Sequence, residues 1–222
     1  MMSAGRRAAI VITALVILGV AAGLTLVLRN RSSSQASQAV VHLGNTTLVY
    51  PAAYARFAQG RAGGIFDRVE MAFTVPDLRP AGASISALKA DDAIEPGERQ
   101  LVFLTLRPQD ETADPAERTE TLYARFLQSD VWQGESGLLM RRFEASSPYE
   151  REELHFVPPD GRSFAARCVR PTQPPSDLPS TCLATVRRDG LDIDIRFSPT
   201  LLAHWNVLTD GVRRLVDSFI QR

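Results

Sequence analysis

The chain has three histidines, His42, His155 and His204, and these are its best candidates for acid–base chemistry. A catalytic histidine works with a nucleophile and with an acid that orients it. No serine stands in a G-x-S-x-G context, no pattern fixes a serine or an acid beside any histidine, and His155 is expected to point outward from a strand. The histidines therefore do not predict a hydrolase.

Two aspartates, Asp192 and Asp194, alternate along one predicted strand and share a face, as a pair of catalytic carboxylates could. Arg187 and Arg196 are expected beside them, which favours cross-strand charge pairs over a catalytic or metal-binding role. The chain also has no phosphate loop, dinucleotide fingerprint, EF-hand or zinc spacing. The sequence thus predicts no enzyme, no metal and no cofactor.

A hairpin predicted at 181–197 turns at Asp189-Gly190. A two-residue turn at this position gathers the apolar side chains on one face, with Cys182 opposite Phe197. Cys182 is therefore expected to face inward.

A second hairpin, predicted at 152–170, turns at Pro159-Asp160-Gly161 and allows two registers. A two-residue loop would pair Leu154 with Arg167 and divide the apolar residues between the two faces. A three-residue loop pairs Leu154 with Ala166 and gathers them on one face, so the pattern favours it. This register turns Cys168 inward as well.

The two inward cysteines predict a disulfide, Cys168 to Cys182. The segment between them contains four prolines and cannot form a regular element. A disulfide persists in an oxidising compartment, whereas a cytosolic domain would hold two buried free thiols instead.

The amino-terminal residues predict a membrane anchor. Residues 8–28 are 21 uncharged, mostly apolar residues, about 31 Å as a helix, which matches the hydrocarbon core of a bilayer. Residues 1–7 form a short tail with two arginines and no acid, which favours a cytoplasmic amino terminus. Residues 29–39 are rich in serine and glutamine and read as a tether, leaving 40–222 as one periplasmic domain.

A cleaved signal peptide, ending near Ser37-Gln38-Ala39, is the alternative to this anchor, although its apolar region would be unusually long. Within the apolar run, Gly19, Ala22 and Gly23 form a small-residue face that could support dimerisation of the helix in the bilayer.

Periodicity in the remaining chain predicts an α+β domain with a mainly antiparallel sheet of about six to eight strands. An internal helix is expected from Asp114-Pro115 to about Gln128, and a longer amphipathic helix of about 22 residues from Ser198-Pro199, packed on the sheet. Strands are expected at 40–43, 47–50, 67–75, 101–106 and 138–143, besides the two hairpins, and a short helix at 52–59. Residues 76–97 have little periodicity, and we expect either an excursion with its own small strand near 84–88 or a functional loop.

Charge and composition narrow the function. The net charge of the chain is zero, which argues against nucleic acid as a partner. The first 31 residues carry four arginines and no acid, so residues 32–222 carry a net charge of −4. Trp132 and Tyr149, with the 76–97 loop, are candidates for a recognition surface. The sequence predicts an envelope interaction or scaffold protein, anchored in a bacterial inner membrane and binding an envelope protein; alternatives are a small-ligand or lipid-binding module, with the ligand between sheet and terminal helix, and an envelope hydrolase.

Overall fold

The computed structural model describes residues 37–81, 100–170 and 180–222. The described residues from 38 onward form one compact unit. Within the described ranges, no helix is both long and apolar enough to cross a membrane. The expected anchor at 8–28, with Gly19, Ala22 and Gly23, and most of the long loop lie outside them.

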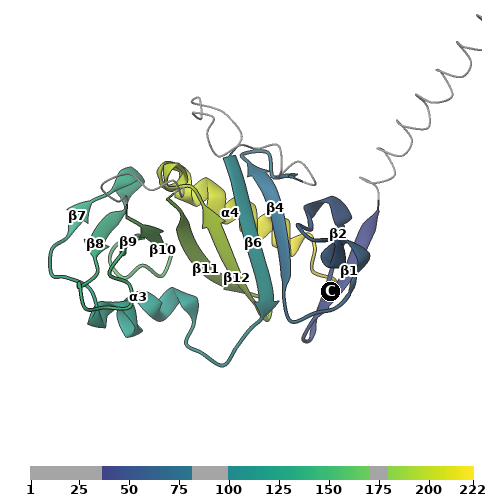
Figure 1. Cartoon of the computed structure of the whole chain (residues 1–222), viewed down its shortest axis with the longest axis horizontal. Coiled ribbons are helices and arrows are strands. Elements are labelled where there is room, and N and C mark those ends of the chain that lie inside the picture. The colour runs from purple at the N-terminus through teal and green to yellow at the C-terminus, as the bar shows by residue number, and fades with distance from the viewer. Residues whose placement is uncertain (1–36, 82–99, 171–179) are drawn as a thin grey trace, which may run out of the picture. The chain divides into compact units, whose positions relative to one another are not determined.

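A nine-stranded sheet forms the centre of the domain, in the order β5-β4-β6-β12-β11-β10-β9-β8-β7, and each neighbouring pair is antiparallel (Figure 1). The strands are β4 (Val69–Val75), β5 (Arg79–Pro80), β6 (Gln100–Pro108), β7 (Trp132–Gln133), β8 (Leu139–Arg142), β9 (Glu152–Phe156), β10 (Ala165–Val169), β11 (Cys182–Arg188) and β12 (Leu191–Phe197). In β4, β6 and β12 buried apolar residues alternate with half-buried or polar ones over most of the strand, which is the period-two pattern of a sheet with one core face. The α+β class is confirmed, with more strands than expected.

A small sheet joins β1 (Gln38–Leu43), β2 (Thr46–Pro51) and β3 (Gly64–Ile65). The helical turns η1 (Ala52–Tyr54) and α2 (Ala58–Ala62) connect β2 to β3, in place of the single helix expected there. The Tyr50 hydroxyl donates to the carbonyl of Gly60 at 2.8 Å, and burial raises the pKa of Tyr50 to about 12, so this donor stays protonated.

The terminal helix is shorter than expected. A 3₁₀ segment, η6 (Pro199–His204), leads into α4 (Trp205–Asp217), and the Ser198 side chain caps the start. The chain leaves the helix because Phe219 and Gln221 hydrogen-bond to the edge of β2 instead. α4 lies behind the sheet in Figure 1, and Leu208, Val212 and Val216 are buried in the main core with the inner faces of β4, β6, β11 and β12.

The hairpin of β11 and β12 confirms the predicted register. Cys182 pairs with Phe197 and Arg187 with Asp192. Asp189 and Gly190 both have positive φ, 48° and 79°, as a tight two-residue turn requires.

The expected register of the other hairpin is wrong. Leu154 pairs with Arg167 rather than with Ala166, so the apolar residues do divide between the two faces of the sheet. The reason is a second apolar cluster on the face opposite α4. Leu154 and Phe156 are buried there with Leu127 and Phe143.

The internal helix is wrong in length for the same reason. It is broken into η3 (Pro115–Glu117), α3 (Arg118–Thr121) and η4 (Tyr123–Arg125), although Asp114 caps the start as expected. The helix ends because the chain from Phe126 to Gln128 hydrogen-bonds to the chain just after β8. Between β7 and β8 lies a further turn, η5 (Glu135–Gly137). The broken helix covers the second cluster.

Candidate functional site

One face of the nine-stranded sheet is covered only in part. On the face opposite α4, the segment containing α3 covers β9 and β10 and borders β11 through η3, whereas β4, β6, β12 and the rest of β11 carry no further layer among the described residues (Figure 1). We call this uncovered surface the open face. Its half-buried or exposed side chains are Glu70, Leu101, Phe103, Thr105, Arg107, Asp194, Arg196, Leu183, Thr185 and Arg187.

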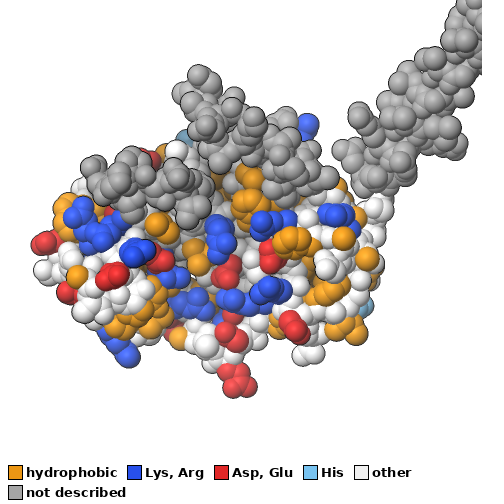
Figure 2. Space-filling view, in the orientation of Figure 1, with side chains coloured by type: hydrophobic (Ala, Val, Ile, Leu, Met, Phe, Trp, Pro, Cys, Tyr) orange, Lys and Arg blue, Asp and Glu red, His pale blue; other side chains and the backbone are white. Residues whose placement is uncertain are grey.

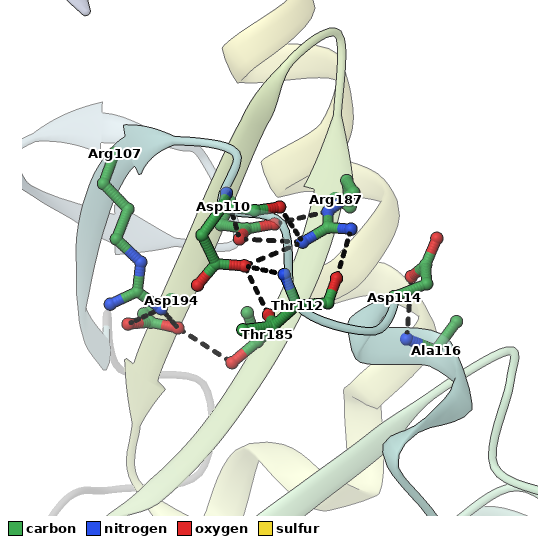
Figure 3. A network of polar contacts seen from close by, with 9 residues as sticks. Arg107, Asp110, Thr112, Asp114, Ala116, Thr185, Arg187 and Asp194 are labelled. Carbon is green, nitrogen blue, oxygen red and sulfur yellow. Dashed lines mark hydrogen bonds and ion pairs between the residues drawn. The ribbon is translucent and has the colours of Figure 1, made fainter. Parts of the chain in front are cut away.

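Arg187 and Asp192 anchor one row of the open face. The Nε of Arg187 lies 2.7 Å from Oδ1 of Asp192, whose side chain has no exposed surface. The hydrogen bond to Asp192 raises the pKa of Arg187, so the guanidinium remains charged. Asp194 is likewise held by Arg107 at 3.2 Å and by the Thr185 hydroxyl at 2.8 Å (Figure 3). Asp192 and Asp194 therefore both join neighbouring strands of the sheet. The partner of Asp194 is Arg107, not the expected Arg196.

Arg187 also fixes the chain that borders the open face. It donates to the carbonyl of Thr112 at 3.2 Å and lies 3.3 Å from the carboxylate of Asp110 (Figure 3). Hydrogen bonds from Thr112, followed by the charges of Arg187 and Arg118, lower the pKa of Asp110. These contacts hold the start of the α3 segment against β11.

The open face carries an arginine, Arg196, that has no charge partner among the described residues. Arg196 is exposed and makes no ion pair or side-chain hydrogen bond with another described residue. It lies between Leu183 and Phe103 on neighbouring strands, and Arg56 stacks over the Phe103 ring at 4.8 Å. Figure 2 shows arginine side chains across the middle of this face, among hydrophobic ones. Guanidinium groups beside apolar side chains are typical of protein interfaces.

A small pocket lies where the α3 segment meets the open face. Its volume is about 20 Å³, and Arg118, Tyr123, Arg167, Leu183 and Thr185 contribute to its wall. Burial raises the pKa of Tyr123, while the charges of Arg167 and Arg118 oppose this rise, so the phenol stays a neutral donor. The pocket therefore presents two guanidinium groups and a hydroxyl.

A larger hollow, of about 320 Å³, lies beside the small sheet and is lined by Phe57, Phe66, Arg68 and Glu70. Its charged groups already pair with each other, because Arg68 lies 3.8 Å from Glu70. The space between sheet and terminal helix, where a ligand was the alternative expectation, is filled by buried side chains of the main core.

The predicted disulfide is confirmed. Cys168 and Cys182 are joined across the paired strands β10 and β11, and both are buried in the main core. The inward orientation of Cys168 is correct even though the expected register of its hairpin is not.

Trp132 and Tyr149 do not form one surface. Trp132 pairs with Met140 at the sheet edge and lies beneath the guanidinium of Arg142. Tyr149 packs on the opposite face, in the second cluster, where Arg167 stacks over its ring at 4.7 Å. Of the loop proposed with them, only 76–81 is described, and its residues 79–80 form β5.

The histidines lie apart, and His155 is not outward as expected. Its side chain is 12% exposed, and its Nε2 lies 3.0 Å from Glu153 on the α4 side of the sheet. The Nδ1 of His42 lies 3.0 Å from the Thr47 hydroxyl. Within the described ranges, no group of three potential metal ligands gathers.

Sequence reasoning missed Arg118 and Arg167 as site residues. The rejected register, with Leu154 opposite Arg167, was the signal that could have found one of them, because it places Arg167 beside a second cluster. Arg118 has no such local signal, since its position depends on where the α3 segment folds back.

Comparisons with known proteins find similarity in fold. No protein-family model and no curated protein matches the chain. The structure is similar to Smlt3025, an immunity protein of the Stenotrophomonas maltophilia type IV secretion system, with a TM-score of 0.58 and 12% identity over 84% of this chain and 94% of that one. It is also similar to FrpD, an iron-regulated outer membrane lipoprotein of Neisseria meningitidis, with a TM-score of 0.50 and 12% identity over 85% of this chain and 95% of that one. At this identity the similarity establishes the fold alone.

Proposed function

We propose that this chain is an envelope interaction protein without catalysis, held in the inner membrane by residues 8–28, and that its open face binds an acidic surface of a protein partner. The observation that carries the proposal is Arg196, which is exposed, has no ion pair with any residue the structure describes, and lies between Leu183 and Phe103. An arginine flanked by apolar side chains forms strong contacts when a partner excludes water from it. Asp194 and Asp192, which lie on the same strand as Arg196, already pair with Arg107 and Arg187, so they do not neutralise the charge of Arg196.

Two further observations support the location and the kind of partner. The disulfide between Cys168 and Cys182 suits an oxidising compartment outside the cytoplasm. The two proteins of similar fold are described as an immunity protein of a type IV secretion system and an outer membrane lipoprotein. By analogy with the immunity protein, we propose that the chain binds a protein partner and does not convert a substrate.

Charge reversal at Arg196 should abolish co-purification with the partner. The full-length chain with R196E is expressed in its own host and purified. The amount of envelope partner recovered with it should fall about tenfold or more, because a carboxylate would then face the acidic surface of that partner. R214E is the matched control, since Arg214 is equally exposed and unpaired among the described residues but lies on α4. Both variants should keep the thermal midpoint of the wild type. Equal recovery of the partner with R196E and R214E would exclude the open face as the binding surface.

A further inference from the structure

Arg118 is half-buried, and no carboxylate among the described residues lies within ion-pair distance of its guanidinium. It makes no ion pair or side-chain hydrogen bond with another described residue, yet it lines the pocket at the border of the open face. Desolvating a guanidinium without a carboxylate is unfavourable, so such a group invites an anion from outside.

Arg167, across the pocket, is held rigidly in place. Its Nη1 lies 2.8 Å from Glu152, and its guanidinium stacks over the rings of Tyr149 and Tyr123 at 4.7 and 5.6 Å. Glu152 occupies one side of this fork and leaves further N–H donors available. The Tyr123 hydroxyl makes no hydrogen bond with the other described residues and adds a third donor.

We infer that this pocket receives the carboxylate of an aspartate or glutamate side chain of the protein partner, between Arg118 and Arg167. The inference rests on the proposed function and names the group on the partner that is recognised. A carboxylate can accept from two guanidinium groups and a hydroxyl at once.

The size of the pocket favours a side chain over a free metabolite. A volume of about 20 Å³ has room for roughly one water molecule, or for the tip of one carboxylate. Pockets that bury a whole small ligand are usually about 300–1,000 Å³. The rest of the bound molecule must therefore lie outside the pocket.

The position of the pocket agrees with a partner on the open face. Arg167 pairs with Leu183, and Leu183 pairs with Arg196, so one row of neighbouring side chains leads from the pocket to the centre of the open face. A protein that covers Arg196 would reach the pocket without rearrangement of the domain.

Arginine side-chain NMR of the full chain, in micelles of an uncharged detergent, tests the inference without the natural partner. Titration with acetyl-Gly-Glu-Gly-amide should shift the Nε–Hε signals of Arg118 and Arg167 in a saturable manner, while acetyl-Gly-Gln-Gly-amide should leave them in place. R118Q should weaken binding of the Glu peptide about tenfold, by removing one charged hydrogen bond. R214Q, a loss of the same charge on α4, should not change it.

Three results would overturn the inference. These are equal shifts with the Glu and Gln peptides, unchanged affinity in R118Q, and inorganic phosphate binding more tightly than the Glu peptide, which would make the pocket a phosphate site. Loss of the partner with R196E but not with R118Q would refute the pocket and leave the proposed function standing. If the Glu peptide binds but R196E does not reduce recovery of the partner, the proposed function is refuted and the pocket stands as a carboxylate site.

Discussion

Replacing Arg187 with alanine should lower the free energy of unfolding by about 3–5 kcal/mol, the usual cost of leaving a buried charge without its partner. Asp192 has no exposed side-chain surface, and Arg187 meets it with two nitrogens, at 2.7 and 3.0 Å. The substitution also frees the chain at Asp110 and Thr112, which Arg187 holds against β11. Urea unfolding of the wild type and the variant would measure the loss.

The neighbouring residue supplies the control. Arg188 pairs with Asp217 at 2.8 Å, but both side chains are partly exposed and solvent screens the pair, so R188A should cost much less than R187A. The double variant R187M/D192L, which removes both buried charges, should regain most of the stability lost in R187A. If R187A were no less stable than R188A, the pair would not be the anchor of the open face.

Removal of the disulfide by the double substitution C168A/C182A should cost about 3 kcal/mol, the value for closing a loop of this length in the unfolded chain. For a domain of this size the midpoint of thermal unfolding should fall by about 6–12 °C. Alanine suits the comparison because both positions are buried in the main core and a serine hydroxyl would lack a partner.

Reductant separates the disulfide from the packing of the cysteine side chains. Dithiothreitol should lower the midpoint of the wild type towards that of the double variant and leave the variant itself unchanged. Protein isolated from its host without reductant should contain no free thiol. Two free thiols in that protein would contradict both the bond and the oxidising compartment.

The parts of the fold that the sequence predicts correctly are those decided by neighbours in the chain. The β11–β12 hairpin has a turn at Asp189-Gly190 that fixes the register, and its apolar residues, apart from Leu183, then fall on one face. The pair Arg187–Asp192 and the inward position of Cys182 follow directly from this local pattern.

The errors arise where distant segments supply the environment. Leu154 and Phe156 face a cluster built by Leu127 and Phe143, which no pattern within their own hairpin reveals. The internal helix stops near Phe126 because the chain there pairs with the residues after β8. The pocket depends on both features, so it could not be predicted from the sequence.

We expect the open face to contact a protein partner in the envelope. The most direct measurement is in-cell photocrosslinking of the full-length chain, with p-benzoylphenylalanine at position 196 in one strain and at position 207 in another. Val207 is 51% exposed on α4, so it reports chance encounters on a surface away from the open face. We expect one discrete crosslinked protein from position 196 that is absent from position 207. No crosslink from position 196, or the same products from both positions, would contradict it.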